Sequence, residues 1–215
     1  MLTVQNFRKE YHNRLVLAIP QADFPPGIHW LKGRNGSGKT TFFRSVAGLL
    51  PFDGSLVLEA KYDIRRQPVD YRLRVNYGEA EPLYPQFLTA WELICWVATT
   101  KQAPTQQIDE LIDLFGIRDF IKTPIGTYSS GMLKKTSLVL AFLGKPSLIL
   151  LDEPLITLDH ATTKAVIDRI RQSREQGTSF LLSSHQDVDA AELPVDSVWV
   201  VQNQSLESIT QPAGL

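Results

Sequence analysis

The chain has 215 residues, 43% of them apolar, and its 22 Lys and Arg nearly balance its 23 Asp and Glu, so that the net charge is −1. This apolar content can fill a sizeable core and excludes a disordered chain, while the near-neutral charge argues against nucleic-acid binding, which needs a basic surface. The single cysteine, Cys95, excludes a disulfide framework or a cysteine-based zinc site, and no apolar run is long enough to span a bilayer. We therefore expect a globular, cytoplasmic protein.

Strands and helices are indicated in alternation along the chain. Strands are expected at 15–19, closed by Pro20, and at 28–31, directly before a glycine-rich loop. Helices are expected over 40–50, 88–99, 106–115, 132–143 and 161–176, and further strands at 55–59, 148–151 and 179–183. Cys95 and Trp96, in the first helix after residue 85, are expected in the core. This order predicts one α/β domain over 1–215 with a parallel sheet and a helical insertion.

The glycine-rich loop reads GRNGSGKT and fits the pattern G-x-x-x-x-G-K-[ST] in full. Its glycines let the backbone curl so that N–H groups point at phosphate oxygens, and the following helix adds its dipole. Lys39 is expected to reach the β and γ phosphates, and the Thr40 hydroxyl to ligate Mg²⁺. The alternative is a tight loop that matches the pattern without binding phosphate. Its position between a predicted strand and a predicted helix argues against this alternative. The expected nucleotide-binding residues are Gly33, Arg34, Asn35, Gly36, Ser37, Gly38, Lys39, Thr40 and Thr41.

Two acids follow the buried apolar run 148–151, at the strand end where open α/β sheets bind ligands. Asp152 is placed to hold Mg²⁺, and Glu153 to polarise the water that attacks the γ-phosphate. A solvated acidic pair opening a loop before Pro154 is the other reading, and the glycine-rich loop favours the functional one. A P-loop alone does not distinguish a kinase, a GTPase and an ATPase.

A third motif, Tyr128-Ser129-Ser130-Gly131-Met132, directly precedes the apolar helix over 132–143. The order of P-loop, short Ser/Gly signature and apolar strand ending in Asp-Glu-Pro resembles the ATP-binding-cassette (ABC) ATPases. The segment 157–159, ending at Asp159, resembles the loop after the catalytic glutamate, and 183–185 resembles the strand end that carries the switch histidine, His185. The resemblance extends over about residues 3–205.

This resemblance implies a P-loop core with a mostly parallel sheet, an N-terminal antiparallel β portion and an inserted helical subdomain at about 85–130. It implies ATP hydrolysis with ATP and Mg²⁺ as cofactors, catalysed by Lys39, Glu153 and His185. ABC ATPases work as dimers, so Ser129 and Gly131 would face the γ-phosphate held by a second copy, and Asp159 would lie near that interface. The partners implied are separate integral membrane permease subunits, with this chain peripheral on the cytoplasmic face of the membrane.

Four positions bear on how closely the family pattern is followed. The usual signature is Leu-Ser-Gly-Gly-Gln, so Ser130 replaces a glycine and Met132 a polar residue. Glu79 stands where the family has a glutamine that senses Mg²⁺ and the γ-phosphate; its carboxylate can ligate the metal, but it adds negative charge beside ATP. Tyr11 lies where the family often has an aromatic that stacks on adenine, although a tyrosine among strands can simply be packing.

The sequence leaves open which partner the protein acts with, and it leaves other functions open as alternatives to transport. In the family, a short cytoplasmic helix of the permease enters a groove of the helical subdomain, and Leu83, Tyr84, Phe87 and Trp91 would either line such a groove or form the subdomain's core. The signature is similar to that of small ATPases paired with simple export permeases, including the haem-exporter type, which favours export. The alternatives are a non-transport ABC ATPase acting on nucleic acid or ribosomes, a small-molecule kinase, and a module that merely binds ATP.

Overall fold

The computed structural model describes residues 1–184 and 193–209, and their strands form two sheets. The order across the larger sheet is β10 (Ser205–Ser208), β9 (Ser197–Gln202), β3 (Ile28–Lys32), β8 (Ser179–Ser184), β7 (Leu148–Asp152) and β6 (Val75–Gly78). All neighbouring strands except the β9–β10 pair run parallel. The carboxyl ends of β6, β7 and β8 therefore meet at one edge of the sheet, next to the loop that follows β3.

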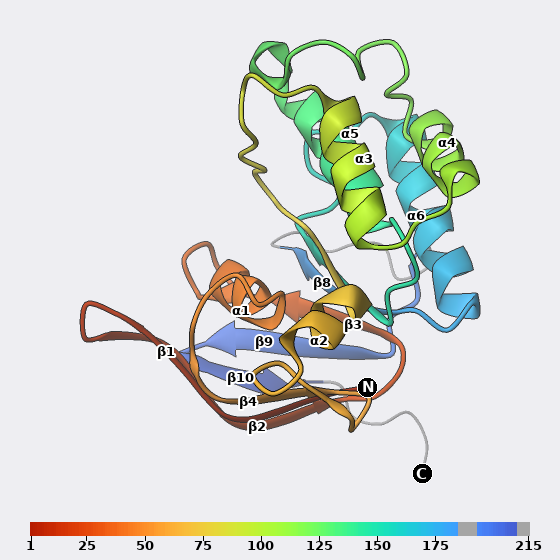
Figure 1. Ribbon diagram of the computed structural model, residues 1–215. Helices are drawn as coiled ribbons and strands as arrows, with labels where there is room; N and C mark the ends of the chain where they lie inside the picture. The colour runs from red at the N-terminus through yellow and green to blue at the C-terminus, as the bar shows by residue number, and fades with distance from the viewer. Residues whose placement is uncertain (185–192, 210–215) are drawn as a thin grey trace.

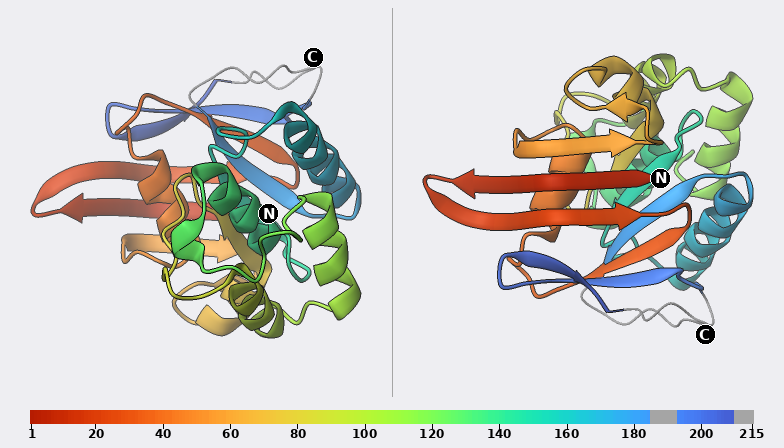
Figure 2. Two further views of the ribbon diagram at one scale, coloured as in Figure 1. Left: turned by 90° about the horizontal axis from the view of Figure 1, so that it is seen from above. Right: turned by 90° about the horizontal axis from the view of Figure 1, so that it is seen from below.

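The second sheet is antiparallel and comes from the N-terminal part of the chain. Its strands are ordered β2 (Arg14–Phe24), β1 (Leu2–Tyr11), β4 (Asp53–Leu58) and β5 (Tyr62–Asp63). Figure 2 shows the long β1–β2 hairpin reaching past the rest of the molecule. Helix α1 (Lys39–Val46) packs in the core shared by the two sheets, where the Phe7 and Phe42 rings meet edge to face with centroids 5.5 Å apart. This packing fixes the helix that carries the P-loop lysine.

Helices gather above the larger sheet in Figure 1 and form the other core. They are α3 (Ala90–Thr100), α4 (Thr105–Leu114), α5 (Ser130–Ala141) and α6 (His160–Glu175). Two shorter helices, α2 (Pro68–Arg74) and the 3₁₀ turn η1 (Ile125–Thr127), lie before β6 and before α5. Helix α5 contacts both α3 and β6, so it joins the helical part to the edge of the sheet where the strand ends meet.

The α/β class, the mostly parallel sheet and the antiparallel N-terminal portion are confirmed, whereas some local expectations are wrong. Strand β2 continues through Pro20 to Phe24, which an edge strand permits because its proline needs no ladder donor there. Trp96, expected in the core, is 70% exposed on α3. Leu83 and Phe87, 89% and 81% exposed, are not core residues of the helical subdomain either.

Candidate active site

The glycine-rich loop closes around its own lysine. The buried Lys39 Nζ donates to the Gly33 carbonyl at 2.6 Å and lies 3.4 Å from the Arg34 carbonyl. Gly38 has a φ of 112°, a conformation that L side chains rarely adopt, and a Cβ on Gly33 would lie 2.6 Å from Ser37 Oγ. The sequence therefore needs glycine at these two positions to bring the lysine and the backbone amides together.

Asp152 is the centre of a hydrogen-bond network formed by four elements. Its Oδ2 accepts from the Thr40 hydroxyl at 2.6 Å and from the Tyr77 hydroxyl at 3.3 Å, and its Oδ1 accepts from the Ser183 hydroxyl. Burial and the Asp152 charge raise the pKa of Tyr77, so its hydroxyl stays protonated and keeps donating. The ends of β6, β7 and β8 and the start of α1 thus hold one carboxylate in a fixed orientation.

The Thr40 hydroxyl and the Asp152 carboxylate are hard oxygen donors in direct contact, which is the donor chemistry that Mg²⁺ prefers. Within residues 1–184 and 193–209, no group of three or more His, Cys, Asp and Glu side chains could hold a metal ion by itself. A magnesium ion at this site would therefore fit as one shared with nucleotide phosphates, the usual arrangement in phosphoryl-transfer enzymes.

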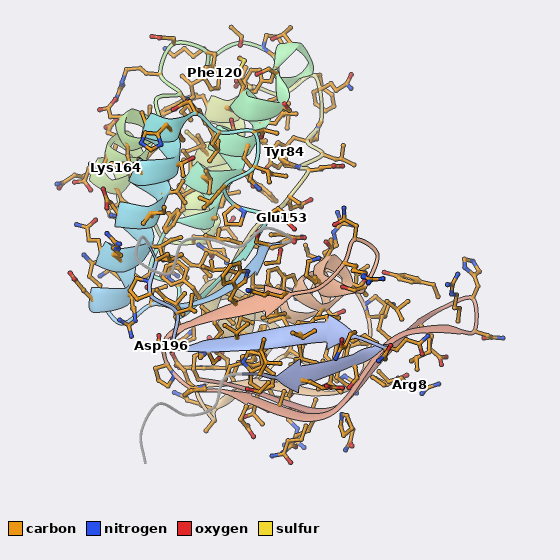
Figure 3. All side chains as sticks on the ribbon, turned by 180° about the vertical axis from the view of Figure 1, so that it is seen from behind. Arg8, Tyr84, Phe120, Glu153, Lys164 and Asp196 are labelled. Atoms are coloured by element: carbon orange, nitrogen blue, oxygen red, sulfur yellow. The ribbon has the colours of Figure 1, made fainter. Side chains whose placement is uncertain are left out.

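Glu153 follows directly and lies at the border between the helical part and the sheets (Figure 3). Its backbone has a φ of 47°, and its N–H donates to Ser183 Oγ at 3.1 Å. A non-glycine residue in this conformation is strained, and such strain gathers at functional sites. A cavity of about 590 Å³ is lined by P-loop residues 35–41 together with Arg44, Tyr77, Asp152 and Glu153. The P-loop and both strand-end acids therefore face one space.

Two cations, unnoticed in the sequence, surround the segment at Glu79. Lys134 is 2% exposed, and its Nζ donates to the carbonyls of Glu79 and Asp152, each at 2.9 Å. Burial lowers the pKa of Lys134 to about 8, although the carboxylates of Asp152, Glu153 and Glu79 favour its charged form. The Glu79 carboxylate lies 3.5 Å from Arg44 Nη2 on α1. Glu79 is thus already paired in this structure rather than facing the cavity.

The signature residues begin helix α5. Ser129 Oγ accepts from the Met132 N–H at 3.2 Å, and the Ser129 N–H donates to the Met132 sulfur at 3.4 Å, so the two residues form a reciprocal capping box. A Cβ on Gly131 would approach the Thr157 carbonyl to 3.2 Å. Helix α5 therefore starts against the loop that follows Glu153.

Asp159, at the end of that loop, caps α6 and also pairs with α5. Its carboxylate accepts from the Thr162 N–H at 2.8 Å and from Lys135 Nζ at 3.0 Å. These hydrogen bonds, that from the Thr162 N–H above all, hold the pKa of Asp159 well below its usual range. The structure thus brings Asp159 and the signature helix together.

One predicted residue, Tyr11, stands apart from this assembly. Tyr11 ends β1 on the hairpin, is 42% exposed, and has Lys9 Nζ 4.7 Å from its ring centroid; it does not line the cavity. His185 lies outside the described residues. The residues that sequence reasoning missed are Tyr77, Ser183, Arg44 and Lys134. Ser183 had the clearest signal, because it ends the strand predicted over 179–183, the next strand along the chain after the one before Asp152, and consecutive strands are often neighbours in a sheet.

The fold and the site define a P-loop nucleoside triphosphatase with its acids at the end of the strand that precedes α6. The family model described as ABC transporter matches residues 23–156, and the chain belongs to that family, as an ATP-binding ATPase subunit. It is 33% identical to the cytochrome c biogenesis ATP-binding export protein CcmA of Legionella pneumophila (strain Lens), over 87% of this chain and 94% of that protein. It is 29% identical to the lantibiotic transport ATP-binding protein SrtF of Streptococcus pyogenes, over 86% and 80%.

Solved structures have the same fold. An ATP-binding subunit of an ABC transporter matches with a TM-score of 0.84 at 24% identity, over 97% of this chain and 90% of the other. A dimeric ATP-binding cassette in a post-hydrolysis state, bound to ADP and phosphate, matches with a TM-score of 0.82 at 16% identity, over 98% and 100%. In the part of the chain that the structure describes, no helix is long and apolar enough to cross a membrane.

Proposed function

We propose that this chain powers an exporter by binding and hydrolysing Mg²⁺-ATP as a dimer on the cytoplasmic face of a membrane, with separate permease subunits as partners. The observation that carries the proposal is the contact of Thr40 with Asp152 beside Lys39, in one cavity with Glu153. Export is supported by the names of the relatives, one an export protein and one a lantibiotic transport protein.

In the proposed reaction, each side chain acts by position and charge rather than by forming a covalent bond. Thr40 and Asp152 would hold Mg²⁺, which when bound supplies charge neutralisation at the phosphates. Lys39 would leave the Gly33 carbonyl and stabilise the charge that develops on the phosphates. Glu153 would orient the attacking water, with His185 as a second contact.

The second copy would complete each nucleotide site. Ser129 and Gly131 stand at the N-terminus of α5, where helix amides and dipole favour an anion. The Asp159 loop packs beside them through Lys135. We propose that these residues face the γ-phosphate held by the partner copy, with Tyr11 stacking on adenine. Glu79 could reach the metal only by leaving Arg44.

The permease is proposed to dock on the segment between β6 and α3. Leu83 and Phe87 are large apolar side chains exposed on this segment, with Trp91 38% exposed just beyond. Large apolar side chains exposed on one short segment favour an interaction surface there, and Leu83 also lines the cavity of the P-loop. The segment begins at Glu79, one end of the network around Asp152, so a partner bound there would contact the loop leading to the site.

The test is an affinity purification of the tagged protein from detergent-solubilised membranes of its own host. The native chain is expected to recover a multi-span membrane protein in stoichiometric amount, and Phe87→Asp to lose it while keeping ATP hydrolysis. Val69→Asp is the matched control, because Val69 is 72% exposed on α2, away from this segment. Recovery from the soluble fraction alone, or equal recovery by Phe87→Asp, contradicts the docking proposal.

A further inference from the structure

One buried ammonium joins three parts of the site that are far apart in the sequence. Lys134 projects from α5, the helix that starts with the signature, and its Nζ bonds the carbonyls of Asp152 and Glu79 at 2.9 Å each. Asp152 ends β7, and Glu79 follows β6. A second bond from α5 supports the first, because the Glu79 N–H donates to Ser137 Oγ at 3.1 Å. Both backbone polar groups of Glu79 are thus held by α5.

The hydrogen bonds of Lys134, together with the carboxylates nearby, indicate what its replacement would remove. Three carboxylates, those of Asp152, Glu153 and Glu79, lie close enough to favour the charged form of Lys134. With an apolar side chain in its place, the buried Asp152 carbonyl and the partly buried Glu79 carbonyl would lose a charge-assisted donor, and the three carboxylates would lose a buried counter-ion. Lys134 does not line the cavity, so this loss would not remove a contact with nucleotide.

We propose that Lys134 is a positioning residue, whose ammonium holds the main chain of Asp152 and Glu79 in register with the signature helix. The inference rests on the proposed function and concerns hydrolysis rather than ATP binding. Its consequence is that a shift of α5, when Ser129 and Gly131 engage the second copy, is carried to the carboxylate that holds Mg²⁺. Without Lys134 the P-loop still binds ATP, but Asp152 is no longer placed for the reaction.

The chain itself offers a matched control. Lys101 follows α3, and its Nζ donates to two backbone carbonyls in the same way, those of Arg72 and of Val75. Val75 is at the opposite end of β6 from the site. Lys101→Met and Lys134→Met therefore each remove an ammonium that donates to two backbone carbonyls, one at each end of β6. Both variants should have a lower melting temperature than the native chain.

The experiment measures melting temperature, ATP affinity and steady-state hydrolysis for the native chain, Lys134→Met, Lys134→Arg and Lys101→Met. We expect Lys134→Met to lower kcat at least tenfold with the ATP dissociation constant within threefold of native, and Lys134→Arg, which can still donate to both carbonyls, to recover a third or more of native kcat. Lys101→Met should keep kcat within twofold. If Lys134→Met does not fold, Lys134→Gln, a neutral side chain that keeps two N–H donors, should give an intermediate kcat.

Two outcomes separate the failure of this inference from failure of the proposed function. If the native chain hydrolyses ATP and Lys134→Met, or Lys134→Gln in its place, loses no more kcat than Lys101→Met, the positioning role is wrong. A loss of ATP affinity in step with kcat also overturns it. If the native chain itself does not hydrolyse Mg²⁺-ATP, the proposed function fails first.

Discussion

Replacing Ser183 by alanine perturbs both strand-end acids through one atom. The Ser183 hydroxyl donates to Asp152 Oδ1 and accepts from the Glu153 N–H at 3.1 Å, and the side chain is fully buried. In Ser183→Ala, Asp152 loses a donor, while the Glu153 N–H keeps the Ser183 carbonyl at 3.2 Å. Of the described side chains that donate to the Asp152 carboxylate, Thr40 and Tyr77 then remain, and the carboxylate should become less well oriented for Mg²⁺.

The magnitude follows from the kind of bond that is lost. A hydrogen bond to a charged group contributes about 1.5–3 kcal/mol to the free energy of unfolding. In a chain of this size, each kcal/mol lowers the melting temperature by about 2–4 °C, so the expected loss is about 3–12 °C. Removing a partner that orients a metal ligand typically lowers activity by about 10- to 100-fold. We expect kcat to fall in that range.

The assay compares Ser183→Ala with Ser179→Ala, on the same strand but at its other end. Ser179 Oγ accepts from the Gly27 N–H at 3.2 Å and is also buried, and a buried donor left unsatisfied costs about 1–3 kcal/mol. Both variants should therefore lose thermal stability, measured by circular dichroism, while only Ser183→Ala loses hydrolysis, measured as phosphate release at saturating Mg²⁺-ATP. Hydrolysis by Ser183→Ala within twofold of native, or an equal loss in Ser179→Ala, would show that the Ser183 hydroxyl does not orient Asp152 for hydrolysis.

Two further predictions concern residues at the edge of the site. Glu79→Gln removes a negative charge beside Arg44, which lines the cavity, and leaves that cation free to favour a bound nucleotide. We therefore expect ATP to bind up to about fivefold more tightly at low Mg²⁺. Identical Mg²⁺ titrations of ATP affinity for the two proteins would contradict this prediction. Tyr11→Ala should weaken ATP binding about tenfold if the ring stacks on adenine, as measured with a fluorescent nucleotide. Unchanged affinity would leave Tyr11 as a hairpin residue held by Lys9.

The P-loop and the strand-end acids could be predicted because each motif carries its own local geometry. In GRNGSGKT the glycines, the lysine and the following helix are neighbours in sequence, so no tertiary information is needed. Asp152 could be placed at a strand end because the apolar run 148–151 stops abruptly at two acids and a proline. The curled loop around Lys39 and the cavity that contains both acids match these expectations.

The residues around Asp152 could not be found in this way, because sheet order and helix docking bring them together. Tyr77 reaches Asp152 only because β6 pairs with β7, and Lys134 only because α5 contacts β6. Trp96 illustrates a different limit. An apolar stretch on a helix does not say which of its side chains faces the neighbouring helices, and this one faces solvent.

The most direct test of ATP-driven dimerisation and hydrolysis is the mass of Glu153→Gln in solution with and without Mg²⁺-ATP. This variant keeps the shape of the side chain but cannot polarise the attacking water, so it should bind ATP and stop before hydrolysis. Light scattering is expected to give twice the monomer mass with ATP and the monomer mass without it, and Lys39→Met in the same background should remain monomeric. A Glu153→Gln protein that stays monomeric at saturating ATP and still releases phosphate would contradict the account.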